Sequence, residues 1–252
     1  LFVYLEGAMA VPDGSGTYNT SMRTSLNDLQ ILPGQTSSDI FLGDHYTPPG
    51  QPYSGAPWLY SGTEGSGYDT GGTPGDAGYP ATVVDWVYVS IRGGLLLDSE
   101  ICGFAALLHA DGTIEPIDDC CEFNGGDYNI VIEHRNHLIV QSAVEVTMDN
   151  GLLSYDFRAN QSYTDPILGI GSVGQKEVST GVYAMFAGNA EQVISLDADT
   201  DLNLDDILYW EGENGDISRY RTSDYDMNGD VNLNDRRLWE LNNGEYSSVK
   251  RD

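Results

Sequence analysis

The segment 224–235 carries side-chain oxygens at its first, third, fifth, ninth and twelfth positions and a glycine at its sixth. This spacing is typical of a loop that wraps one calcium ion, because Ca²⁺ prefers about six to eight oxygen ligands in a flexible cage. Gly229 allows the sharp turn that closes such a loop. The predicted ligands are Asp224, Asp226, Asn228, Asp230 (through its backbone carbonyl), Asn232 and Asp235. The alternative is a solvated acidic loop, and the fit of so many positions at once favours the metal site.

A second copy of this pattern lies upstream, at an offset of 29 residues that aligns segment 202–206 with segment 231–235. The predicted ligands of this copy are Ser195, Asp197, Asp199, Asp201 (through its backbone carbonyl), Asn203 and Asp206. Ser195 replaces an acid at the first position, and Thr200 replaces the glycine at the sixth. We therefore expect two calcium sites, of which the upstream one binds more weakly.

A short apolar stripe follows each loop, at residues 207, 208 and 210 and again at residues 238, 239 and 241. This spacing predicts a helix with one buried face, and an aspartate at each loop–helix junction favours the helix N-terminus. Each unit is thus predicted to be a calcium loop followed by one helix, and two such units in tandem resemble a dockerin module. The resemblance implies a small α-helical, calcium-dependent domain over residues 190–252. It also implies docking onto a cohesin-like domain or a neighbouring subunit.

The chain of 252 residues has 39 acidic and 11 basic residues, which gives a formal net charge of −28. Nucleic-acid binding requires a basic surface, so this charge excludes that class of function. No stretch of the sequence is long and apolar enough to span a membrane. Abundant Gly and Tyr with few Lys favour a secreted β-rich protein of the cell surface, and residue 1 is expected to lie at or near a processed N-terminus.

The chain contains three cysteines, Cys102, Cys120 and Cys121. In an extracellular protein we expect one disulfide, which joins Cys102 to either Cys120 or Cys121. The third thiol is then left over, either buried or paired between chains. Adjacent cysteines without other Cys or nearby His ligands make a poor zinc site, so no metal is expected here.

Runs of β-branched and aromatic residues mark the middle of the chain. Strands are predicted over 1–6, 82–92, 104–110, 113–117, 126–134, 137–141, 143–148, 152–157 and 182–186. Short connections, such as the Asp-Gly turn at 111–112, predict antiparallel neighbours. The expected fold is therefore mostly β, with an antiparallel Ig-like or prealbumin-like β-sandwich over residues 1–189.

Residues 11–80 are rich in Gly, Pro, Ser and Tyr, with dense turn signals. A loop region of this length is unusual inside a compact domain unless it has a function. One interpretation is that it packs against the sandwich and caps it. The other is that its aromatic residues form a ligand or assembly surface that can stack on sugars. The candidate aromatic residues are Tyr53, Trp58, Tyr60 and Tyr79.

His134 and His137 are the candidate pair for metal or acid–base chemistry. Residues three apart on a strand face opposite sides, so only a turn between them brings the two rings together. A structural role in a hairpin is the favoured interpretation. No nucleophile elbow, phosphate-binding loop or carboxylate pair at a fixed distance accompanies them, so we expect no catalytic residues and no enzyme activity.

The order of these blocks resembles a module found at the C-termini of secreted surface proteins of Bacteroidota. The resemblance is carried by residues 22–29, 52–58, 83–87, 105–108, 111–114, 134–138 and 181–185. In that group the sandwich runs directly into calcium repeats. The resemblance implies a non-catalytic surface or matrix component.

Two functional hypotheses follow. The first is a calcium-stabilised extracellular structural protein that docks through its dockerin-like tail or its sheet edges onto neighbouring subunits, in a filament or surface layer. Its cofactor is Ca²⁺ and its partner is a protein. The second is a carbohydrate-binding or adhesion module of the cell surface, with glycans as ligands. A hydrolase that carries a dockerin is a third class, which the lack of a catalytic motif disfavours.

Overall fold

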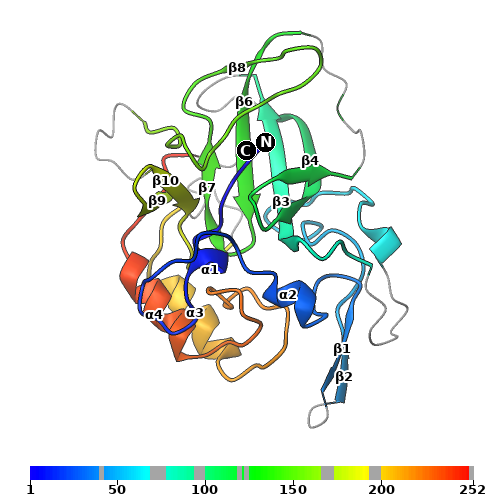
Figure 1. Ribbon diagram of the computed structural model, residues 1–252, viewed down its shortest axis with the longest axis vertical. Coiled ribbons are helices and arrows are strands. Elements are labelled where there is room, and N and C mark those ends of the chain that lie inside the picture. Colours follow the sequence, from blue (N-terminus) through cyan, green and yellow to red (C-terminus); the bar gives the residue numbers. More distant parts are fainter. Residues whose placement is uncertain are drawn as a thin grey trace.

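The computed structural model describes residues 1–39, 43–68, 78–93, 100–117, 121, 125–165, 173–192 and 200–249. Its centre is a six-stranded antiparallel sheet with the strand order β5-β4-β3-β6-β7, in which β8 also pairs with β6 (Figure 1). The strands of this sheet are β3 (Val83–Arg92), β4 (Glu100–His109), β5 (Ile114–Pro116), β6 (Asp127–His134), β7 (His137–Gln141) and β8 (Val146–Thr147). Their antiparallel pairing agrees with the short connections in the sequence.

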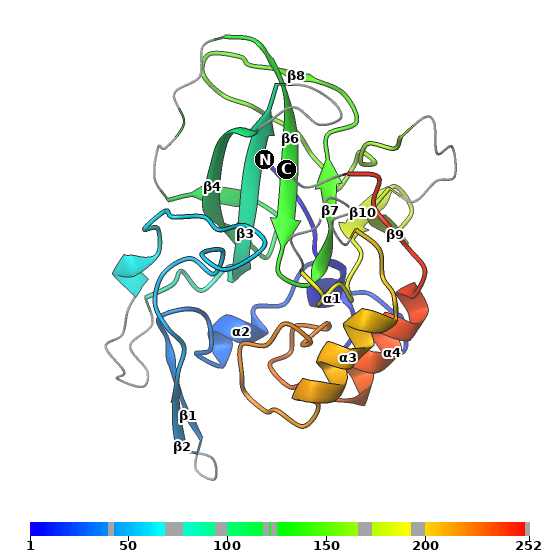
Figure 2. The same ribbon diagram turned by 180° about the vertical axis from the view of Figure 1, so that it is seen from behind.

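Two smaller antiparallel sheets accompany the central one. β9 (Gln175–Ser179) and β10 (Val182–Met185) pair with each other and lie beside β7. β1 (Thr36–Asp39) and β2 (Gly43–Tyr46) form a hairpin that projects away from the main sheet (Figure 2). The short helical elements are α1 (Glu6–Met9), α2 (Ser25–Asp28) and η1 (Ser66–Tyr68). The mostly β, antiparallel fold class is confirmed, whereas the Ig-like or prealbumin-like two-sheet arrangement stays a prediction.

β3 is buried along its whole length, because both faces of the sheet are covered there. On one face Trp86 and Tyr88 meet the tyrosine-rich segment: the Trp86 Nε1–H donates to the Tyr79 hydroxyl (2.9 Å), and the Tyr53 and Tyr88 rings lie 5.7 Å apart. Val87 alternates with these aromatic residues along the strand and is buried on the other face. Part of the long loop region thus packs over the sheet, as the first interpretation of residues 11–80 expects.

The four candidate aromatic residues do not form one surface platform. Tyr53 and Tyr79 are buried, and their hydroxyls donate to the carbonyls of Trp86 and Pro33 (both 2.8 Å). Trp58 and Tyr60 are half-buried. Aromatic residues bury large areas, and here the sheet already uses most of that area as core. Tyr53 and Tyr79 are therefore unavailable for stacking on a sugar, whereas a sugar contact at Trp58 or Tyr60 stays a prediction.

Residues 1–5 run through the interior and do not form the edge strand expected over 1–6. Phe2 bridges to Thr113 on one side and to Asp156 on the other, and Leu5 bridges to Met185. The chain then turns into α1, whose residues are buried. Because this backbone is paired inside the fold, it is not free to add to a neighbouring sheet.

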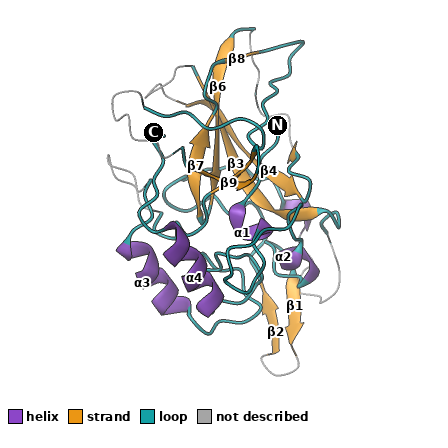
Figure 3. Ribbon diagram, turned by 60° about the vertical axis from the view of Figure 1, so that its left-hand side comes forward, coloured by secondary structure: helices purple, strands orange, loops and turns teal. Residues whose placement is uncertain are grey.

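Two ten-residue helices, α3 (Leu204–Glu213) and α4 (Leu233–Asn242), lie side by side below the sheet (Figure 3). They begin and end 29 residues apart, which is the offset of the sequence repeat. Each starts with a capping box, in which the N-cap asparagine and the aspartate three residues later satisfy each other's backbone N–H groups. Within the described chain, these helices are too short and too polar to cross a bilayer.

A reciprocal pair of hydrogen bonds joins the two helices. The Trp210 Nε1–H donates to the carbonyl of Asn232 (2.8 Å), and the Trp239 Nε1–H donates to the carbonyl of Asn203 (3.2 Å). Each tryptophan of one helix therefore bonds the N-cap residue of the other, at the same 29-residue offset. The tryptophan rings belong to a small core that also contains Tyr225. The repeat in the sequence is thus a local two-fold arrangement in the structure.

The strand predictions differ from the structure in several segments, and of the strand predicted over 143–148 only β8 (Val146–Thr147) is formed. β1, β2 and β9 lie in polar or glycine-containing sequence, where alternation is too weak to predict a strand. Residues 152–157 instead make isolated bridges, at Leu152 and Asp156. Of the two disulfide pairings left open, Cys102–Cys121 is formed, and Cys120 lies outside the described residues.

Candidate metal centre

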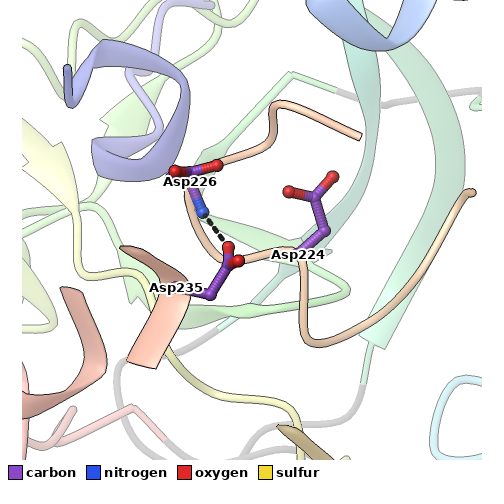
Figure 4. Close-up of side chains that lie close together, drawn as sticks. All are labelled: Asp224, Asp226 and Asp235. Carbon is purple, nitrogen blue, oxygen red and sulfur yellow. Dashed lines mark hydrogen bonds between the residues drawn. The ribbon is translucent and has the colours of Figure 1, made fainter. Parts of the chain in front are cut away.

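Three aspartates of the downstream loop converge on one point. Asp224, Asp226 and Asp235 each place a carboxylate oxygen so that all three oxygens lie within 4.8 Å of one another (Figure 4). Asp224 and Asp235 are 0% exposed and Asp226 is 1% exposed. Three buried carboxylates are costly to hold together unless a cation compensates their charge. The cluster therefore has the composition of a cation site.

Backbone N–H groups of the loop hold these carboxylates in place. The N–H groups of Asn228 and Gly229 donate to the two oxygens of Asp224 (3.0 and 2.9 Å). The N–H of Asp226 donates to Asp235 Oδ1 (3.0 Å), the dashed bond in Figure 4. Gly229 has a φ of +92°, and a Cβ there would lie 2.5 Å from Leu29 Cδ1. The backbone conformation therefore favours glycine at the sixth loop position, whereas the flexible end of Leu29 could move away from a Cβ.

The other three predicted ligands have distinct roles in the loop. Asn228 Oδ1 accepts from the N–H of Asp230 (2.8 Å). The Asp230 side chain accepts from the N–H of Ser218 (3.0 Å), and its carbonyl accepts from Asn232 Nδ2 (3.3 Å). Asn232 caps α4 by accepting from the N–H of Asn234 (2.8 Å). A capping amide at the ninth position fits the water-mediated contact that is common there.

Burial and mutual repulsion raise the pKa values of the three carboxyls. Loss of hydration followed by the neighbouring Asp235 raises the pKa of Asp224 to about 8. The same causes, with Asp226 as the neighbour, raise the pKa of Asp235 to about 8, and with Asp224 as the neighbour raise that of Asp226 to about 7. A bound cation favours the ionised carboxylates and reverses these shifts. The donors are all oxygens, so the residues present fit a hard cation such as Ca²⁺.

The loop is anchored to the sheet by the turn between β6 and β7. Asn136 Nδ2 donates to the carbonyl of Asp224 (2.8 Å), and the Arg23 guanidinium donates to the carbonyl of Asp226. The Asn136 carbonyl in turn accepts the N–H groups of Gly188 and Asn189 (3.0 and 3.1 Å). One buried turn residue therefore contacts both the downstream loop and the segment that follows β10.

His134 and His137 are brought together by this turn, and their ring nitrogens are engaged. The two Nδ1 atoms lie 2.9 Å apart, His134 Nε2 lies 3.1 Å from Asp85 Oδ2, and the Gly7 N–H donates to His137 Nε2 (3.1 Å). Both rings are fully buried, and burial lowers the pKa of each below its usual value. This arrangement is a neutral hydrogen-bonded pair that supports the turn, the structural role favoured from the sequence.

The upstream copy is described only in part. Ser195, Asp197 and Asp199 lie outside the described residues. Asp201 is exposed, and Asn203 caps α3 by accepting from the N–H of Asp205 (2.6 Å). Asp206 is buried, and this burial raises its pKa to about 7. Asp206 thus holds the same place at the start of α3 that Asp235 holds at the start of α4.

The hydrogen bonds that Asp206 accepts point to Asn189 and Glu191 as candidate ligands of the upstream site, and the sequence did not suggest either residue. Asp206 Oδ1 accepts from the N–H groups of Ala190 and Glu191 (2.7 and 3.0 Å). Asp235 accepts from Tyr225 and Asp226 in the same way. This match aligns Asn189 with Asp224 and Glu191 with Asp226. It differs from the predicted register, which starts the loop at Ser195.

In this alignment the first ligands of the two loops, Asn189 and Asp224, are 35 residues apart, whereas the last ligands, Asp206 and Asp235, are 29 residues apart. The upstream loop is therefore six residues longer than the downstream loop. The side-chain oxygen and nitrogen of Asn189 are buried and make no hydrogen bond within the described chain. The one signal in the sequence is a Gly-Asn pair at 188–189 that ends an apolar strand. A fixed-length loop pattern cannot find it.

A hydroxyl, an imidazole and a carboxylate also lie in a row on the outer part of the sheet. Thr82 Oγ1 lies 2.8 Å from His109 Nδ1, and His109 Nε2 lies 2.7 Å from Glu115 Oε2. Thr82 directly precedes β3, His109 ends β4 and Glu115 lies on β5, and these three strands are neighbours in one sheet. We interpret them as cross-strand pairs that fix the sheet register.

Comparison with known proteins does not assign this chain to a family. No protein-family model matches the chain, and no curated protein matches it. Two crystal structures resemble it in part: an N-terminal and a C-terminal interface mutant of the type II cohesin–X–dockerin complex from Acetivibrio cellulolyticus. Each shows 20% identity over 64% of this chain and 83% of the other, with TM-scores of 0.38 and 0.36. Such low scores show neither a shared fold nor a shared partner, so the dockerin-like tail and the Bacteroidota module stay predictions.

Proposed function

We propose that this protein is a calcium-stabilised, non-catalytic extracellular assembly protein that docks onto a protein partner. The observation that carries the proposal is the buried convergence of Asp224, Asp226 and Asp235. Cation binding to these carboxylates is coupled to folding, because an unfolded loop does not hold them together. The ion here is a structural element, and no reaction is assigned to it.

Calcium would be held by the residues of the downstream loop. The ligands are Asp224, Asp226, Asn228, the carbonyl of Asp230, Asn232 through water, and Asp235. In the upstream unit, Asn189, Glu191 and Asp206 are the ligands that the hydrogen-bond match supports. When bound, the ion neutralises carboxylates that otherwise repel one another. Because Asn136 and Arg23 bond the carbonyls of this loop, an ordered loop also holds α4 against the sheet.

The outer face of α3 is the docking surface in this proposal. Leu204 and Leu208 are more than half exposed and lie four residues apart, so they share one face of the helix. The corresponding face of α4 is partly covered, since Leu241 and Arg237 contact the chain near Gly14 and Gly16. We call Leu204 and Leu208 the leucine face. Its partner is a protein, either a second copy of this chain in a filament or surface layer or a cohesin-like domain.

Light scattering in calcium tests this proposal. The double variant Leu204→Gln, Leu208→Gln removes the leucine face while keeping good helix formers, and Leu152→Gln is the matched control at an exposed leucine elsewhere. We expect the wild type and the control to form species larger than a monomer at high concentration, and the double variant to stay monomeric. A wild type that stays monomeric in calcium, and binds no cohesin domain, would contradict the docking role.

A further inference from the structure

A pocket of about 320 Å³ lies between the sheet and the helical tail. Its walls come from the segment 52–58, the β6–β7 turn, the chain after β10, α3, and the segment 220–222. The lining residues used here are Trp58, Arg135, Gln192, Tyr209, Tyr220 and Thr222. The volume is at the lower end of the range of about 300–1,000 Å³ that is typical of small-ligand sites.

Hydrogen bonds and ring packing hold Trp58 and Tyr220, two aromatic residues of the pocket wall, in fixed orientations. The Trp58 Nε1–H donates to Glu133 Oε2 (2.9 Å), and the Tyr53 ring packs edge-on at 4.8 Å from the Trp58 ring. The Tyr220 hydroxyl donates to Asp85 Oδ1 (2.7 Å). Tyr209, on α3, is 44% exposed and lines the same pocket. Rings that are already oriented need little ordering when a ligand binds.

The polar part of the pocket wall consists of Arg135, Gln192 and Thr222. Arg135 Nε donates to Asp85 Oδ2 (3.1 Å), and its Nη1 donates to the carbonyl of Arg221. Arg135 is only 6% exposed, and among the described residues its Nη2 has no hydrogen-bond partner. This nitrogen has almost no accessible surface, so it belongs to the buried base of the wall and is not a contact for a ligand. Gln192 and Thr222 add an amide and a hydroxyl to the same wall.

We propose that this pocket binds one neutral pyranose unit of an oligosaccharide. A pyranose has an apolar C–H face that can lie on Trp58 or Tyr209, and hydroxyl groups that can exchange hydrogen bonds with Gln192 and Thr222. An acidic ligand is disfavoured, because Asp85 already neutralises Arg135 at 3.1 Å and the chain carries a net charge of −28. A polar wall that offers an amide and a hydroxyl also suits a ligand rich in hydroxyls better than an apolar side chain of a protein partner.

This site was not visible in the sequence, because its residues are far apart along the chain. Trp58 and Arg135 belong to the region 1–189, whereas Gln192, Tyr209 and Tyr220 belong to the region 190–252. The pocket therefore exists only when the helical tail is packed on the sheet. Sugar binding should favour that packed arrangement, independently of any contact at the leucine face.

Titration calorimetry of the full chain in calcium with cellotetraose, xylotetraose and mannotetraose tests the proposal, with tetragalacturonate as the acidic comparison. We expect saturable binding of at least one neutral tetrasaccharide. Tyr209→Ala should weaken that binding by at least about fivefold, which is the size of one lost stacking contact. The control Tyr46→Ala, at an exposed tyrosine of the projecting hairpin, should leave the binding unchanged.

Three results would overturn the assignment. The first is a wild type that binds none of the neutral tetrasaccharides. The second is a Tyr209→Ala variant that binds the sugar as tightly as the wild type and the Tyr46→Ala control. The third is tighter binding of tetragalacturonate than of every neutral sugar, which would assign the pocket to anions. Because Tyr209 is exposed on α3, its variant is expected to fold, and an unchanged melting temperature confirms this.

Discussion

At the residue scale, the charge state of Asp224, Asp226 and Asp235 decides the behaviour of the loop. In the absence of a cation their pKa values are about 8, 7 and 8, against an ordinary value of 3.8. The folded chain therefore holds more protons than the unfolded chain between about pH 4 and pH 8. Stability contributed by these protons is complete below about pH 4 and is lost as the pH rises through about 8.

This pH dependence of stability gives a prediction for the metal-free protein. Its free energy of unfolding should fall between about pH 5.5 and about pH 8.5, while the protein in calcium should show no such fall, because the ion displaces the protons. The measurement is urea unfolding at several pH values, with and without calcium. Subtracting the unfolding free energies without calcium from those with calcium removes the contribution of the buried histidines, because they are present in both series. A calcium-induced stabilisation that shrinks as the pH rises would contradict this account.

The residue scale also shows where the sequence was sufficient. The loop 224–235 is local, and the spacing of its oxygens with Gly229 at the turn was enough to predict which carboxylates meet. Asn189 and Glu191 were not predictable, because the six extra residues of the upstream loop break the fixed spacing. Burial of Tyr53 and Tyr79 depends on Trp86, a partner that no local pattern reveals.

At the scale of elements, the β6–β7 turn joins the sheet to both repeat units. Asn136 uses its side-chain N–H on Asp224 and its carbonyl on Gly188 and Asn189. The sequence predicted both strands of this hairpin and the turn between them. The contact between Asn136 and Asp224, which are 88 positions apart in the sequence, arises from tertiary packing and could not be predicted.

Replacing Asn136 by Ala tests this connection. The change leaves the Asp224 carbonyl without its buried donor and should cost about 1–3 kcal/mol of unfolding free energy. It should also weaken calcium binding, because the loop loses the bond that holds its first residue. Asn19→Ala, at an exposed loop asparagine, is the matched control. Urea unfolding and calcium titration of both variants make the comparison, and equal values for the two would count against the role of the turn.

At the scale of the whole molecule, the tail is packed closely against the sheet. The Glu6 carboxylate of α1 accepts from Asn242 Nδ2 of α4 (2.6 Å), from the Ala187 N–H (3.0 Å) and from the Tyr18 hydroxyl (2.5 Å). The Tyr220 hydroxyl reaches Asp85 at the start of β3. The sequence predicted the β-rich class and two helices at the right offset. It did not predict this packing, nor that residues 1–5 lie inside the fold.

The central claim is that a cation at Asp224, Asp226 and Asp235 holds this structure together. Scanning calorimetry of the wild type in EDTA and in excess calcium tests it most directly, with Asp235→Asn as the variant and the exposed Asp205→Asn as the control. Calcium at about 100 times its dissociation constant adds about 2.7 kcal/mol, which corresponds to a rise in melting temperature of roughly 5–10 °C. We predict this rise in the wild type and the control and a clearly smaller rise in Asp235→Asn, in which only the weaker upstream site is left. Equal melting temperatures of the wild type in EDTA and in calcium would contradict the account.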